Sequence, residues 1–101
     1  MNIESSHSLE QVRHEIDRID RQMLVLLAAR GDCVRQAARF KRSAAEVPAP
    51  QRVEAVIAGV VAHARTLGAD PVVAETTWRA MIAAFIQSEL AAHAALHPPS
   101  T

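Results

Sequence analysis

The sequence predicts an all-α fold in which a single domain, residues 1–101, holds three helices: one long, one short and one of medium length. Composition is the first observation behind this prediction, because 20 residues are alanine, only three are glycine and 3% are aromatic. Such a mixture favours helices and lacks the side chains that strands prefer. The second observation is a spacing of apolar residues in alternating steps of three and four, which is typical of one helix face. The third is the placement of prolines and a glycine, which divides the chain into three segments.

The first helix is expected over about residues 8–42. It begins at Ser8, which together with Gln11 fits a capping box for the free backbone N–H groups of the first turn. Its apolar seam runs through Leu9, Val12, Ile16, Ile19, Met23, Leu26, Arg30, Cys33, Ala37 and Phe40. The steps alternate without a slip, as in a heptad repeat. Arg30 is the one charged residue on this seam, and Cys33 is expected to be a small buried hydrophobe.

A hinge is expected at residues 43–50, because Pro48 and Pro50 prevent the first helix from continuing. Pro50 is well placed in the first turn of the second helix, which is expected over about residues 50–66. Gly68 ends that helix, since glycine readily adopts the left-handed conformation found after a helix.

The third helix is expected over about residues 71–96, between an N-cap at Asp70 and a stop at Pro98. Pro71 suits its first helical position. Its seam runs through Trp78, Ile82, Phe85, Glu89, Ala92 and Leu96. Glu89 is the charged residue on this seam, as Arg30 is on the first.

The length of the first helix predicts a homodimer. At 1.5 Å per residue this helix is about 50 Å long, whereas a compact monomer of this size has a radius of gyration of about 13 Å. The protruding half still carries an apolar seam that needs a cover, and a second copy is the simplest partner. We therefore expect an intertwined helical homodimer in which the first helices pack against each other.

Charge and cysteine content exclude several classes of function. Eleven basic residues balance eleven acidic ones, so there is no global excess for binding nucleic acid or an anionic membrane. One cysteine is too few for a disulfide framework or a multi-cysteine zinc site. There is no signal-peptide pattern, and no apolar run approaches the roughly 18 residues of a membrane span. We expect a cytoplasmic protein without metal or cofactor.

The two charged residues on the seams have a structural and a functional interpretation. Arg30 and Glu89 could form a structural ion pair, as polar residues in coiled coils do. However, Arg30 and Lys41 are eleven residues apart, which returns to within about 20° of the same helix face. Val34 and Ala37 lie between them on that face. Two cations separated by small apolar residues predict a pocket for a small dianion, which arginine grips well.

Two further arginines complete the predicted site. Arg13 lies roughly 25 Å from Arg30 along the helix axis and cannot share a small site with it on one chain. In the dimer it can enter the site of the partner subunit. Arg52, just after the hinge, can close the pocket.

Glu89, His93 and His97 share one helix face, and this spacing is also compatible with metal ligands. The last turn should fray because Pro98 follows directly, so this interpretation is the weaker one.

Five stretches carry a resemblance to a known family. They are VR at 12–13, EIDRID at 15–20, LLAAR at 26–30, ARFK at 38–41 and VPAPQRV at 47–53, together with Glu89. With these residues placed, the chain resembles the all-helical (type II) class of chorismate mutase, an intertwined dimer of three-helix subunits. The resemblance implies chorismate, a small dicarboxylate, as substrate and rearrangement to prephenate as reaction. That step belongs to aromatic amino acid biosynthesis by the shikimate pathway.

The resemblance also implies roles for the site residues. The arginines, with Arg13 supplied by the other subunit, hold the two carboxylates of the substrate. Lys41 and Glu89 contact the ether oxygen of the breaking bond, and with Arg30 they form the implied catalytic set. The implied binding residues are Arg13, Arg30, Val34, Ala37, Lys41, Arg52, Val56, Ile86 and Glu89. Glu89 helps only when protonated, which predicts an activity that falls as the pH rises.

Two departures keep other activities open. Val53 stands where typical family mutases carry an acidic residue, and the hinge is more similar to the subgroup containing isochorismate pyruvate lyase, which forms salicylate. Glu89 stands where that lyase and many bacterial mutases have glutamine. Chorismate mutase is the first choice, and isochorismate pyruvate lyase or a mutase of amino-deoxychorismate is the alternative. A non-catalytic helical dimerisation module is the second alternative, and the pathway (primary aromatic synthesis or a siderophore route) stays open.

Overall fold

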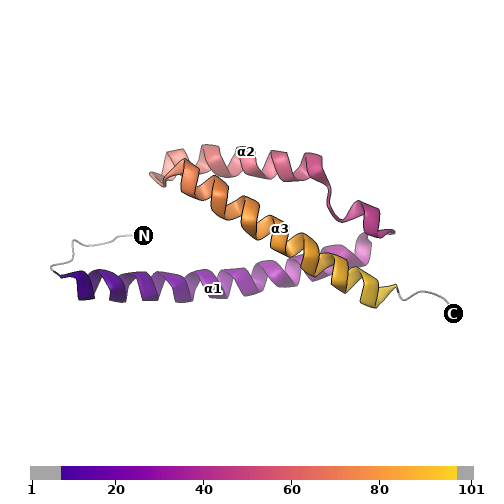
Figure 1. Cartoon of the computed structure of the whole chain (residues 1–101), viewed down its shortest axis with the longest axis horizontal. Helices are drawn as coiled ribbons and strands as arrows, with labels where there is room; N and C mark the ends of the chain where they lie inside the picture. The colour runs from indigo at the N-terminus through magenta and orange to yellow at the C-terminus, as the bar shows by residue number, and fades with distance from the viewer. Residues whose placement is uncertain (1–7, 98–101) are drawn as a thin grey trace. The chain divides into compact units, whose positions relative to one another are not determined.

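The computed structural model describes residues 8–97, which form three α-helices and one 3₁₀ turn. In chain order these are α1 (Leu9–Phe40), η1 (Ala44–Glu46), α2 (Pro50–Leu67) and α3 (Pro71–Leu96) (Figure 1). Residues 8–97 contain no strand, which confirms the predicted all-α class and the order long, short, medium. The predicted stop at Pro98 lies outside the described residues. No helix within residues 8–97 is long and apolar enough to cross a membrane.

The chain divides inside α1 into two compact units, residues 1–32 and 33–101. In the first unit Ser8 caps α1 as predicted, because its hydroxyl accepts a hydrogen bond from the backbone N–H of Gln11 at 3.2 Å. The predicted seam of this unit is exposed in the single chain, and Leu26, for example, is 69% exposed. The other exposed seam residues of the unit are Leu9, Val12, Ile16 and Met23.

The second unit begins with the last two turns of α1, which end at Phe40, two residues before the predicted end. The helix stops there because the backbone N–H of Arg42 donates to the Glu46 carboxylate at 2.7 Å instead of to a helical carbonyl. Cys33 is exposed in the single chain, so its predicted burial is wrong for an isolated subunit. Phe40, the last seam residue of α1, is 85% exposed.

Local sequence sets the ends of α2 and α3. Pro50 is the first residue of α2, and the preceding Ala49 has a left-handed backbone with φ of 37°. Gly68 ends α2 with φ of 75°, a conformation that glycine adopts without steric strain. Asp70 caps α3 by accepting hydrogen bonds from the next turn, with Val72 N at 2.9 Å. Pro50, Gly68 and Asp70 thus stand at the helix ends for which the sequence analysis named them.

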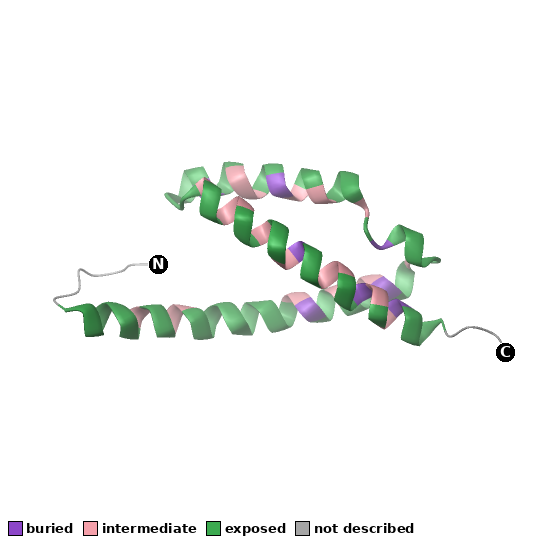
Figure 2. Ribbon diagram, viewed as in Figure 1, coloured by how far each residue is buried: buried purple, intermediate pink, exposed green. Residues whose placement is uncertain are grey.

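The core of the second unit lies where α3 packs against α2 and η1. In Figure 1 α3 turns back from the end of α2 and runs in the opposite direction beside it. The buried apolar residues are Ala38, Val47, Ile57, Ala64 and Ile82, and the buried polar residues are Glu89 and His93 (Figure 2). This apolar core is small, so the two polar residues are a large part of what α3 buries.

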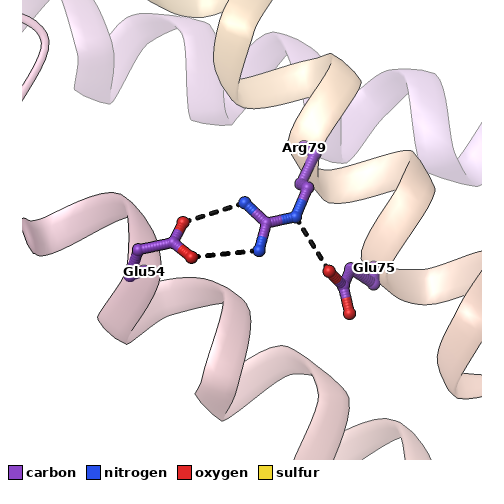
Figure 3. A network of polar contacts seen from close by, with 3 residues as sticks. All are labelled: Glu54, Glu75 and Arg79. Carbon is purple, nitrogen blue, oxygen red and sulfur yellow. Dashed lines mark hydrogen bonds and ion pairs between the residues drawn. The ribbon is translucent and has the colours of Figure 1, made fainter. Parts of the chain in front are cut away.

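An exposed cluster of charges connects α2 and α3 (Figure 3). The Arg79 guanidinium on α3 donates to both carboxylate oxygens of Glu54 on α2, at 2.8 and 3.1 Å. It also donates to Glu75, one turn earlier on α3, at 2.8 Å. The hydrogen bonds from Arg79, and its charge, hold the pKa of Glu54 below its ordinary value of 4.5.

We predict that Glu54→Gln destabilises the protein at neutral pH but not in acid. A carboxyl with a lowered pKa contributes stability above its ordinary value of 4.5, and this contribution is lost as the pH falls through the lowered value. Urea unfolding at neutral and acidic pH measures the difference from wild type. Asp20→Asn, on exposed α1, is the control. A difference that persists unchanged in acid would contradict the prediction.

Candidate active site

The candidate site centres on a largely buried ion pair between Lys41 and Glu89 in the second unit. The ammonium Nζ of Lys41 lies 2.5 Å from Oε2 of Glu89. The Glu89 side chain is 9% exposed and that of Lys41 is 25% exposed, so water screens this pair far less than it screens a surface pair. The sequence analysis assigned both residues to the site, and the structure brings them together.

The helical period explains why a carboxylate is buried at this place. Glu89 follows Ile82 by seven residues and precedes His93 by four, so the three side chains share one face of α3. All three are buried. A buried carboxylate needs a charged or hydrogen-bonding partner, and Lys41 supplies both.

His93 makes a second contact with the same lysine. Its ring atom Nε2 lies 2.9 Å from the backbone carbonyl oxygen of Lys41. A carbonyl oxygen only accepts hydrogen bonds, so the ring N–H is the donor. Lys41 is therefore held at both ends by α3, through its backbone by His93 and through its ammonium by Glu89.

His93 was not predicted to belong to the site. Glu89, His93 and His97 were placed on one helix face, where metal ligation was the weaker interpretation. Within residues 8–97 there is no group of three or more His, Cys, Asp and Glu side chains that could hold a metal ion. The i, i+4 spacing of Glu89 and His93 was the available signal that His93 faces the site. However, the hydrogen-bond partner of His93 is a backbone atom 52 residues earlier in the chain.

The apolar residues predicted to line the site belong to three different helices. Val34 and Ala37 lie on the last turns of α1, Val56 on α2 and Ile86 on α3. All four are half-buried, which is the exposure expected of residues at the edge of a site. Their contact with a substrate stays a prediction.

The three arginines predicted to bind the substrate carboxylates have different surroundings. Arg52 is exposed in the first turn of α2, directly after the hinge. Arg13 and Arg30 belong to the first unit, where Arg13 is exposed and Arg30 is half-buried on α1. The assignment of these three arginines as substrate ligands stays a prediction.

The Lys41–Glu89 pair has a defined chemical capability. The ammonium offers N–H donors, and the carboxyl, when it carries a proton, offers an O–H donor beside them. Both can point at an oxygen atom that gains negative charge during a reaction. The pair is thus suited to stabilising charge in a partly dry environment.

Two comparisons with known proteins bear on this site. Residues 12–90 match the family described as chorismate mutase type II. A segment of 54 residues is 44% identical to the isochorismate pyruvate lyase of Pseudomonas aeruginosa. That match covers 54% of this chain and 54% of the lyase, so it spans about half the length of each protein.

We predict that the pair is energetically coupled. Lys41→Met leaves the Glu89 carboxylate buried without its cation, which should lower the free energy of unfolding by about 2–3 kcal/mol. The double variant Lys41→Met/Glu89→Leu removes both charges and should recover most of that loss, because an apolar pair can replace a buried ion pair. Urea unfolding measures both values.

Arg42→Met is the matched control for this experiment, because it removes an exposed cation directly beside Lys41. It should leave the free energy of unfolding nearly unchanged. Glu89→Leu alone completes the cycle, and a double variant whose loss equals the sum of the Lys41→Met and Glu89→Leu losses would show that the pair is not coupled.

Proposed function

Because the chain belongs to the chorismate mutase type II family, we propose that it is an enzyme that rearranges chorismate to prephenate. The observation that carries this proposal is the buried contact between Lys41 and Glu89, at 2.5 Å. It provides two polar groups side by side for the ether oxygen of the substrate. The family match covers both residues.

The reaction needs positioning and charge stabilisation rather than a nucleophile. In the rearrangement the ether C–O bond breaks while a new C–C bond forms, and no atom enters or leaves the molecule. The ether oxygen gains negative charge as its bond to carbon breaks. The Lys41 ammonium, and Glu89 when protonated, donate hydrogen bonds to that oxygen and so stabilise the transition state more than the substrate.

The arginines supply the positioning. Chorismate carries two carboxylates, and guanidinium groups bind carboxylates in a fixed planar geometry. We propose that Arg30 and Arg52 bind from one subunit and Arg13 from the other. The half-buried Val34, Ala37, Val56 and Ile86 contact the carbon skeleton. Holding both carboxylates restricts the substrate to its reactive conformer, which lowers the entropic part of the barrier.

The second copy follows from the exposed seam of α1. Large apolar side chains such as Met23 and Leu26 are exposed in the single chain at the regular spacing of a helix-packing face. An isolated soluble chain rarely exposes a continuous apolar stripe of this kind. We propose that the seam of a second subunit covers it, which also delivers Arg13 to the site of the partner.

Isochorismate pyruvate lyase is the second candidate. The P. aeruginosa protein of that name shares 44% identity over 54 residues with this chain. Val53, which replaces the acidic residue of typical family mutases, is half-buried on α2. Elimination of pyruvate from isochorismate breaks the same kind of ether bond, so Lys41 and Glu89 would serve either reaction.

A parallel assay on chorismate, isochorismate and amino-deoxychorismate tests the proposal. We expect prephenate from chorismate. In Glu89→Gln the amide supplies an N–H donor at the same position, so kcat/KM should not fall.

Each other outcome of the assay has a defined meaning. Salicylate and pyruvate formed from isochorismate at much higher efficiency would assign the protein as the lyase. Turnover of amino-deoxychorismate alone would assign the amino-substituted mutase. No product from any of the three would refute all enzymatic proposals and favour a non-catalytic dimerisation module.

Mixed dimers test the shared site. We predict that Arg13→Ala and Lys41→Ala homodimers each lose at least about 100-fold in kcat/KM, because each lacks one essential ligand. Random mixing of the two variants should restore about a quarter of wild-type activity, since half of the dimers are mixed and each has one intact site. Co-purification of the two variants through an affinity tag carried by one of them is the control for subunit exchange. No recovery in exchanged dimers would show that Arg13 does not cross the interface.

A further inference from the structure

The starting observation is that one helix of this chain holds both ends of a single residue. His93 binds the backbone carbonyl of Lys41 at 2.9 Å, and Glu89 binds its ammonium at 2.5 Å. The two anchors are four residues apart on α3, which corresponds to about 6 Å along the helix axis. His93 is 5% exposed, so its contact with Lys41 is shielded from water.

Lys41 needs a backbone anchor because of its position. It is the first residue after α1, and its carbonyl lies beyond the regular hydrogen bonds of the helix. Lys41 also begins the segment that leads to η1. This segment has no regular helical hydrogen bonds to fix its backbone. A lysine has a long flexible stem, so its ammonium is placed well only if the backbone that carries it is fixed.

Substrate binding is expected to change the Glu89 contact of Lys41 but not its His93 contact. When the Lys41 ammonium turns to the ether oxygen of a substrate, it shares its N–H donors between that oxygen and Glu89. The hydrogen bond from the His93 ring to the Lys41 carbonyl involves neither group, so it can persist throughout the reaction.

We propose that His93 is a positioning residue, which fixes the backbone of Lys41 so that its ammonium is held at the reacting oxygen. This inference rests on the proposed function for the role of Lys41. His93 itself touches neither the substrate nor the reacting atoms. Its ring also lies against that of His97, with centroids 4.4 Å apart.

Substitutions at His93 test the role of its N–H donor. His93→Leu and His93→Phe remove the donor, whereas His93→Gln keeps an N–H at a similar distance from the backbone. We expect both apolar variants to lower kcat at least about tenfold and to change KM less than about threefold, because misplacing a reacting group slows the chemical step. His93→Gln should stay within about threefold of wild type. The matched control His63→Leu makes the same change at an exposed histidine of α2.

The kinetic pattern separates positioning from a merely structural role. A structural role would lower the melting temperature and the folded fraction but leave kcat per folded protein unchanged, and this result would overturn the proposal. Equal losses in His93→Gln and His93→Phe would also overturn it, because the donor would then be irrelevant. His93→Phe keeps an aromatic ring in the core, so it preserves the test if His93→Leu does not fold.

A double-mutant cycle keeps the inference testable if wild type turns over neither substrate. In that case the proposed function fails. Urea unfolding of Lys41→Met, His93→Phe and their double variant then shows whether His93 positions the Lys41 side chain. If His93 positions the Lys41 side chain, the loss caused by Lys41→Met shrinks clearly in the His93→Phe background, by about tenfold in the unfolding equilibrium constant. Additive losses would show that His93 does not act on that side chain.

Discussion

The ion pair between Lys41 and Glu89 is the constraint on which the second unit depends. Glu89 lies on the same face of α3 as Ile82, so packing of the apolar residue also buries the carboxylate. A buried carboxylate is tolerated only beside a partner, and the partner is Lys41, the residue directly after α1. The contact therefore anchors the start of the segment that leads to η1. Val47, just after η1, is buried in turn, whereas residues 42–46 are exposed, so the connection is held to the core at its two ends.

The sequence predicted the parts of this fold that depend on neighbouring residues. Ser8, Pro50, Gly68 and Asp70 act within one helical turn, and each occupies the cap or first-turn position expected of its type. The end of α1 was predicted two residues late, because the Glu46 side chain that takes the N–H of Arg42 lies in a loop without a repeating pattern. Local rules describe helix ends well, whereas a side chain from a loop follows no period.

The site could be predicted where a charged residue interrupts the apolar seam of a helix. Glu89 could be selected because one carboxylate interrupts an apolar seam, and Lys41 because it shares a helix face with Arg30. The family resemblance implied that Lys41 and Glu89 meet, and they do. His93 could not be paired with its partner, because a histidine on an amphipathic helix has many uses and a carbonyl oxygen leaves no mark in the sequence. The Arg79–Glu54 contact was missed for a related reason, since exposed charges of opposite sign are common on every helix.

The small apolar core and the exposed seam of α1 connect the stability of the protein with its proposed function. Two of the five buried apolar residues described in this chain are alanines, Ala38 and Ala64, so the core of one subunit removes little apolar surface from water. The larger apolar side chains of α1 remain outside that core. In the proposed dimer, burial of the α1 seam by a second copy adds hydrophobic stabilisation to this small core. If Arg13 completes the site of the partner, the contact that stabilises the dimer also assembles the site. A substitution on the seam would then reduce activity through assembly, although it touches no substrate.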